Sequence, residues 1–226
     1  PTGASRYYRW AFDQTYEYHA ARSSSVVYDD ATQTVEDRPP GQQIYRCWKD
    51  YPSTQLMLST TAKLSQDIVY RYPLVHIPFG DQALSVLYSL QVTQYVMTSD
   101  AYNYYLQLLA NTESLGSVFD ILPTQLTGNI HNVADPTEPV IGYISAGTAA
   151  VQRIYIHYND LFYWEYDFEC PGPDIQVTPD STVFYFADHL FTPIAFGAGV
   201  YVANQTTCVD CTANGGTNQK PAYWPN

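Results

Sequence analysis

The sequence has few basic residues and no long apolar run. Ten Lys and Arg stand against 22 Asp and Glu, which gives a net charge of −12. Nucleic acids and anionic membrane surfaces are bound through clustered Lys and Arg, so both are disfavoured as partners. Because no stretch of about 18 apolar residues occurs, the sequence predicts no membrane-spanning helix.

Motifs of common enzymatic chemistry are also missing. No G-x-S-x-G surrounds a serine nucleophile, and Gly215-Gly216 lacks the Lys-Ser/Thr context of a phosphate-binding loop. The five histidines are scattered along the chain. We therefore predict a protein that is not an enzyme, with no catalytic residue, no cofactor site and no metal site.

A carboxylate pair for glycoside cleavage stays open, because two distant acids can meet in space. The acids nearest an aromatic-rich segment are Asp160, Glu165, Asp167 and Glu169. Sugars stack on such rings, but an outward-facing acidic strand edge is the favoured interpretation.

What the sequence does contain is typical of β-proteins. It has 22 tyrosines, 46% hydrophobic residues and only 14% charged residues. Tyrosine packs on a pleated sheet while its hydroxyl reaches water. Residues 6–18 alternate, with one predicted buried face made of Tyr8, Trp10, Phe12, Tyr16 and Tyr18.

Turn residues separate several such segments along the chain. Residues 19–42 are predicted to be a long solvated loop, in which calcium binding by the acidic pairs is a weak alternative. Strands are expected at 6–18, 43–48, 55–59, 67–77, 84–96, 128–133, 140–145, 151–158, 162–168 and 182–187. Their spacing predicts an antiparallel sandwich of the fibronectin or immunoglobulin type over 1–97. The second predicted region, 98–226, is β-rich, contains one clear helix and is closed by cysteines.

The helix is expected at about 99–114. Ser99 is the predicted N-cap and Gly116 the predicted stop. An apolar stripe at helical spacing is expected to pack against the sheet, and its members are Tyr102, Tyr105, Leu106 and Leu109.

The four cysteines are Cys47, Cys170, Cys208 and Cys211. The single C-x₂-C lacks the second pair of zinc ligands and the helix of a redox motif, so disulfides are favoured over metal or redox chemistry. Cys170 is expected to pair with Cys208 or with Cys211, which would fix the tail to the sheet. Two short patterns predict glycosylation, at Ser181 and at Asn204.

Five motifs taken together resemble a known family. They are YYRWAF…TYEY at 7–18, YRCW at 45–48, SDAYNYYLQLLANTESLGSVFD at 99–120, PTQLTGNIHNVADPTEPVIGYISA at 123–146 and CVDCTANGGTNQKPAYW at 208–224. The set is similar to the C-terminal portion of a Bacteroidota outer-membrane lipoprotein family that is defined by a domain of unknown function. Members are commonly encoded beside TonB-dependent transporters of the starch-utilisation type.

The resemblance implies a non-catalytic cell-envelope subunit. Such a subunit would associate with an outer-membrane β-barrel, expected to be a TonB-dependent transporter, and aid ligand capture or assembly at the surface or periplasmic face. A secreted carbohydrate-binding or carbohydrate-active module is the alternative. The chain lacks an initial Met and a signal peptide, so we expect a fragment or processed product whose lipid-anchored N-terminal part is a further partner. The expected partner surface lies in the 119–139 crossing, at Phe119, Leu122 and Ile130.

Overall fold

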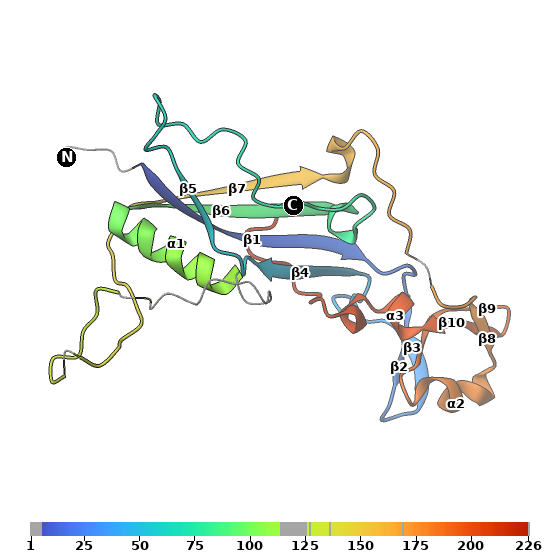
Figure 1. Cartoon of the computed structure of the whole chain (residues 1–226). Helices are drawn as coiled ribbons and strands as arrows, with labels where there is room; N and C mark the ends of the chain where they lie inside the picture. The colour runs from blue at the N-terminus through green and yellow to red at the C-terminus, as the bar shows by residue number, and fades with distance from the viewer. Residues whose placement is uncertain (1–5, 114–125, 127, 136, 169, 226) are drawn as a thin grey trace, which may run out of the picture. The chain divides into compact units, whose positions relative to one another are not determined.

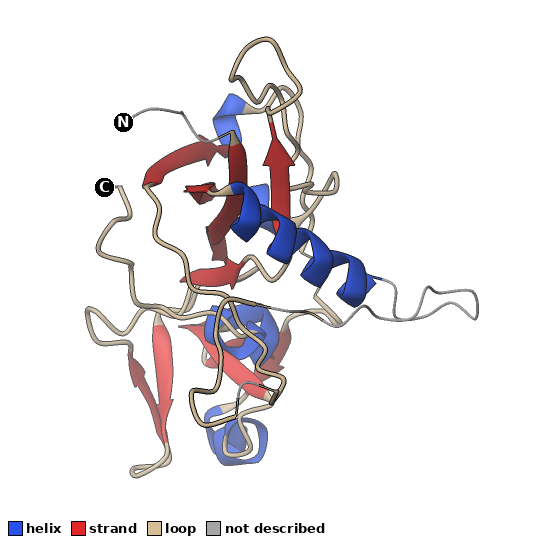
Figure 2. Cartoon of the chain, turned by 60° about the vertical axis from the view of Figure 1, so that its left-hand side comes forward, coloured by secondary structure: helices blue, strands red, loops and turns tan. Residues whose placement is uncertain are grey.

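The computed structural model describes residues 6–113, 126, 128–135, 137–168 and 170–225 (Figure 1). Of the described residues, 34% lie in strands, which form antiparallel sheets, and 18% are helical, so the fold is mainly β as the composition predicts (Figure 2). It forms two compact units that interleave along the sequence. Unit 1 comprises Pro1–Asp13, Pro52–His76 and Leu90–Ile154, and unit 2 comprises Gln14–Tyr51, Ile77–Ser89 and Tyr155–Asn226.

Three sheets account for the strands of the described residues. The five-stranded sheet has the order β4-β1-β6-β7 with β5 also paired to β1, and its strands are β1 (Tyr7–His19), β4 (Arg46–Pro52), β5 (Met57–Thr60), β6 (Leu87–Met97) and β7 (Ala149–His157). Unit 2 holds the other two sheets. One is a two-stranded sheet of β2 (Val26–Asp29) and β3 (Thr34–Asp37). The other is a three-stranded sheet with the order β8-β10-β9, whose strands are β8 (Ile175–Val177), β9 (Phe191–Gly197) and β10 (Val200–Gln205). The predicted domain boundary at residue 97 stays a prediction. Strand β7 follows that residue in the sequence, but it joins a sheet whose other strands all end at or before residue 97.

The β1 strand confirms its alternating pattern. All five predicted inward residues are at most 8% exposed: Tyr8, Trp10, Phe12, Tyr16 and Tyr18. Thr15 and Glu17 are also buried, at 2% and 3% exposure. The second half of β1, which belongs to unit 2, is therefore covered on both faces.

Helix α1 (Ser99–Glu113) is the long helix of unit 1 and lies beside β5 (Figure 1). It exists as predicted, but its N-cap is Thr98, whose Oγ1 accepts a hydrogen bond from the Ala101 amide at 3.2 Å. Its buried face is centred on Ala101 and Tyr104, at 0% and 8% exposure. The predicted stripe is thus displaced around the helix, because Leu106 is 45% exposed. Gly116 lies outside the described residues.

In unit 2 a small core forms around β8, β10 and α2 (Thr182–Phe186). Val177, Phe186 and Ala203 are each at most 1% exposed and pack together. The β9–β10 hairpin closes through Ala198 and Gly199, both with positive φ, as a two-residue turn matched to the strand twist requires.

Several predicted elements are wrong. Residues 67–77, 128–133, 140–145 and 162–168 contain no strand in the described part of the chain, and 182–187 holds the short helix α2. The predicted strand at 151–158 exists as β7, but it pairs with β6 and not with residues 140–145. The supposed loop at 19–42 contains the β2–β3 hairpin.

The remaining helical elements are short. They are α3 (Thr206–Val209), η1 (Gln82–Leu84), η2 (Tyr158–Asp160), η3 (Pro179–Ser181) and η4 (Cys211–Asn214). No helix within the described residues has the length and apolar character needed to cross a membrane.

Candidate functional site: an aromatic cleft in unit 2

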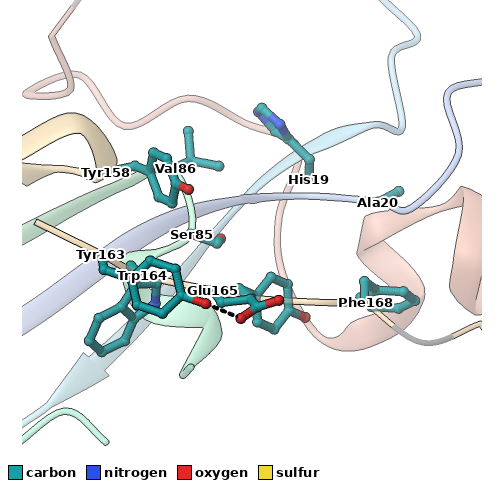
Figure 3. Close-up of a pocket in the computed structure, with 10 residues that line it drawn as sticks. His19, Ala20, Ser85, Val86, Tyr158, Tyr163, Trp164, Glu165 and Phe168 are labelled. Carbon is teal, nitrogen blue, oxygen red and sulfur yellow. Dashed lines mark hydrogen bonds between the residues drawn. The ribbon is translucent and has the colours of Figure 1, made fainter. Parts of the chain in front are cut away.

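A cleft of about 490 Å³ opens in unit 2 between the end of β1, the start of β6 and the segment that follows β7 (Figure 3). We call it the aromatic cleft, and its lining consists of His19, Ala20, Ser85, Val86, Tyr158, Tyr163, Trp164, Glu165, Tyr166 and Phe168. Half of these side chains are aromatic. A concave site with many rings and a few polar groups is the usual form of a small-molecule site.

The 162–168 segment supplies most of the rings, although it forms no sheet ladder. Its side chains still alternate, with Trp164, Tyr166 and Phe168 partly buried and the intervening Tyr163, Glu165 and Asp167 exposed. Side-chain hydrogen bonds hold it instead of a neighbouring strand. Trp164 Nε1 donates to the Asp81 carbonyl at 3.1 Å, and Gln82 Nε2 donates to the Tyr166 hydroxyl at 2.8 Å.

Two tyrosines of this segment have hydroxyl groups with a raised pKa. Tyr163 donates its hydroxyl hydrogen bond to Glu165, and this bond raises the pKa of Tyr163. Burial raises the pKa of Tyr166. Both phenols are therefore neutral at ordinary pH and act as hydrogen-bonding groups.

The opposite wall is polar. His19 Nε2 lies 3.2 Å from Glu17 Oε1, and the His19 ring stacks on Tyr45 at 4.7 Å between centroids. Ser85 Oγ is buried without a hydrogen-bond partner among the described residues. A buried hydroxyl without a partner costs free energy, so Ser85 is a candidate for contact with a ligand.

The predicted acids are not arranged as a catalytic pair in the described part of the chain. Glu165 is the one carboxylate in the lining. Asp160 accepts a hydrogen bond from the His157 amide and caps η2, and Asp167 is exposed outside the lining. Glu169 lies outside the described residues. Cleavage of a glycosidic bond uses two flanking carboxylates, so this geometry favours binding.

A second cleft, of about 490 Å³, lies in unit 1 beside Trp10 and Tyr72. These two rings stack on each other at 4.9 Å, so each covers a face of the other. Asp67 is held there by hydrogen bonds from Thr61 and Tyr8, which lower its pKa. Trp10 is only 7% exposed, whereas Tyr163 in the aromatic cleft is 63% exposed, so this cleft offers a ligand less ring surface and is the weaker candidate.

The four cysteines form two disulfides, Cys47–Cys211 and Cys170–Cys208. The second is one of the two pairings expected for Cys170. The Cys47–Cys211 bond joins β4 to η4, next to the tail, where Trp48 and Thr217 exchange two backbone hydrogen bonds at 2.8 and 2.9 Å. Among the described residues, no three His, Cys, Asp or Glu side chains gather to hold a metal ion.

The two predicted glycosylation positions differ in accessibility. Ser181 is partly buried, and its hydroxyl lies 3.0 Å from the Thr178 hydroxyl. Asn204 is 1% exposed, and its Nδ2 donates to Asp174 Oδ1 at 2.7 Å. A glycan on Asn204 would replace that buried hydrogen bond, so the folded chain disfavours it.

The predicted partner surface is only partly described. Phe119 and Leu122 lie outside the described residues. Ile130 is partly buried beside Gly142. Neighbouring apolar side chains that the sequence reasoning did not single out are more exposed, with Val133 at 98%, Ile141 at 75% and Ile144 at 72%.

Sequence reasoning placed the aromatic segment but missed two parts of the cleft. The alternation of 162–168 drew attention to its rings, whereas His19 and Ser85 had no signal in the sequence. They enter the lining through the fold, which brings the ends of β1 and β6 to the segment after η2.

Comparison with known proteins yields one match. The family model of DUF4249, a domain of unknown function, matches residues 1–153. No curated protein and no solved structure matches the chain. The matched residues cover more than half of the 226-residue chain but end before the Tyr158–Phe168 wall of the cleft. The chain therefore belongs to the DUF4249 family.

Proposed function

We propose that this protein is a non-catalytic subunit of the cell envelope that captures a ligand for an outer-membrane β-barrel partner, a TonB-dependent transporter. The observation that carries the proposal is the aromatic cleft, with rings fixed by hydrogen bonds and one carboxylate in its described lining. Fixed rings lower the ordering cost of binding, and a lone carboxylate suits recognition better than hydrolysis.

The cysteines support an envelope location. All four are joined in disulfides, which persist in oxidising compartments and are rare in the cytosol. The family resemblance supports attachment to the outer membrane through a lipidated N-terminal part of the same protein. The acidic charge of −12 favours solubility at such a surface.

Exposed apolar residues of unit 1 support a protein partner. Ile141 and Ile144 project from a segment whose backbone is fixed, because Asn129 exchanges two hydrogen bonds with the Ile144 backbone at 2.7 and 2.8 Å. Apolar side chains held at a surface are typical of protein contacts. This surface is our candidate for contact with the barrel, in place of the one that the sequence predicts at Phe119, Leu122 and Ile130.

A secreted carbohydrate-binding or carbohydrate-active module is the second candidate, and the aromatic lining of the cleft favours it. It differs from the first in requiring no barrel partner. Binding or hydrolysis of a sugar by a protein that co-isolates with no barrel would therefore support the second candidate against the first.

Affinity isolation of the tagged full-length protein from native membranes tests the proposal. We expect an outer-membrane barrel to co-isolate, and Ile141→Asp combined with Ile144→Asp to reduce its recovery at least about tenfold, since a buried charge without a partner weakens an interface strongly. Leu190→Asp is the matched control, because Leu190 is 65% exposed in unit 2. Isolation of the wild-type protein without any barrel would refute the proposal.

A further inference from the structure

We infer that the aromatic cleft binds an uncharged saccharide, with a pyranose ring stacked on Tyr163 and sugar hydroxyls bonded to Glu165 and Ser85. The inference rests on the proposed role in ligand capture and specifies the ligand class. Its evidence comes from the exposed rings, the polar groups of the lining and the charge of the lining.

The rings of the aromatic platform are exposed and pack on one another. Tyr163 is 63% exposed, and its ring stacks on Phe79 at 5.7 Å with an interplanar angle of 22°. Trp164 packs against the same Phe79 ring at 5.3 Å. One face of a pyranose presents C–H groups, which match the negative face of an aromatic ring. A platform held in this way stacks a sugar without first ordering its own side chains.

The polar groups next to the platform suit hydroxyl groups. Glu165 is exposed and accepts hydrogen bonds, so a sugar hydroxyl can donate to it. Ser85 lines the same cleft, and its hydroxyl, buried without a partner among the described residues, can both donate and accept a hydrogen bond. Figure 3 shows Ser85 and Glu165 on different segments of the chain around the same cleft.

The charge of the lining argues against acidic sugars. The cleft contains Glu165 and, within the described lining, no Lys or Arg. The whole chain carries a net charge of −12. A uronic acid or sulfated sugar would approach a carboxylate without a cation to pair with, so it is disfavoured.

Proline-rich peptides also dock on aromatic grooves and are the main competing ligand class. Such peptides present carbonyl acceptors and few donors, so their sites depend on donors such as an indole N–H. Here the Trp164 indole N–H is already bonded to the Asp81 carbonyl. The carboxylate of Glu165 only accepts, so the cleft matches a ligand that donates, as a sugar does.

Calorimetric titration of the full chain with maltohexaose, cellohexaose and mannohexaose tests the inference, with hexagalacturonate and a proline-rich peptide alongside. We expect at least one neutral hexasaccharide to bind and hexagalacturonate to bind at least about tenfold more weakly. Tyr163→Ala should weaken the neutral ligand about tenfold through loss of stacking. Phe184→Ala is the matched control, because Phe184 is 79% exposed on α2, outside the cleft.

Ser85→Ala separates binding from folding. It removes an unpaired buried hydroxyl, so the variant should be as stable as the wild type while binding the saccharide about three- to tenfold more weakly. Equal saccharide binding by the wild type and the Tyr163→Ala variant, preference for hexagalacturonate or the peptide, or no binding of any neutral hexasaccharide would overturn the inference. If a barrel still co-isolates in those cases, only the ligand class is wrong; if none does, the proposed function fails as well.

Discussion

Glu17 is the buried carboxylate that connects β1 to its surroundings in unit 2. Its carboxylate accepts a hydrogen bond from Trp224 Nε1 at 2.9 Å and forms an ion pair with Arg46 at 2.8 Å. His19 Nε2 lies 3.2 Å from Glu17 Oε1. Burial alone raises the pKa of Glu17, but the bonds from His19 and Trp224 and the charge of Arg46 outweigh it and lower the pKa below 4.5. Glu17 thereby fixes the C-terminal tail and one wall of the cleft.

This environment predicts a pH-dependent stability. Because the pKa is lower in the folded state, the contribution of Glu17 is complete above the unfolded value near 4.5 and is lost as the pH falls through the folded value. We expect Glu17→Gln to lower the free energy of unfolding by about 1–2 kcal/mol at pH 7 and by less in acid. Urea unfolding at several pH values measures this.

The matched control for Glu17 is Glu36→Gln, since Glu36 is exposed on β3. It should change the free energy of unfolding by less than about 0.5 kcal/mol. An equal loss at pH 7 in both variants, or a Glu17→Gln effect that persists undiminished in acid, would contradict the role of the buried carboxylate.

At the scale of elements, α1 tests how a helix begins. Both Thr98 and Ser99 are good N-cap residues, and Ser99 is the one predicted from the sequence. In the structure the Ala101 amide bonds to Thr98. We expect Thr98→Ala to lower the free energy of unfolding by about 1 kcal/mol and to speed amide exchange in the first turn.

Ser99→Ala is the internal control for the cap, and it should cost less than about 0.5 kcal/mol. Urea unfolding and amide exchange of both variants decide between the two residues. If Ser99→Ala proved the more damaging change, the helix would begin one residue later than the structure has it.

Alternation predicted some elements and not others, for a physical reason. The β1 pattern succeeded because inward rings and sheet pairing act together along 13 residues. Residues 162–168 alternate equally well, yet side-chain bonds to Asp81 and Gln82 hold them where no strand pairs. Thr182–Phe186 is rich in β-formers but forms a helical turn, because tertiary packing of Phe186 overrides weak local propensity.

Across the whole chain, the disulfides connect segments that lie far apart in sequence. Cys47–Cys211 spans 164 residues and Cys170–Cys208 spans 38. Loop-closure entropy predicts about 5 kcal/mol of stabilisation from the first and about 4 kcal/mol from the second. The paired substitutions Cys47→Ser with Cys211→Ser should therefore lower the melting temperature more than Cys170→Ser with Cys208→Ser.

Peptide mapping without reductant accompanies that comparison. It should recover the Cys47 peptide joined to the Cys211 peptide. A Cys170–Cys211 linkage, or a larger loss from the shorter loop, would contradict this account of the tail. Four cysteines allow three pairings, and only the fold selects one, which is why the sequence left the choice open.

The cleft shows the same limit of sequence reasoning. Its aromatic wall was visible as a run of rings, but its polar wall depends on His19 and Ser85, which reach it through β1 and the start of β6. Long-range strand pairing brings these residues to the cleft, and no local pattern encodes that.

Amide hydrogen exchange of the full chain, with and without a saturating neutral hexasaccharide, tests ligand capture by the aromatic cleft most directly. We predict slower exchange at residues 85–86 and 158–168, which form two walls of the cleft, and unchanged exchange at residues 67–74 of the second cleft. Slower exchange confined to residues 67–74, or no change anywhere, would contradict the assignment of the ligand site.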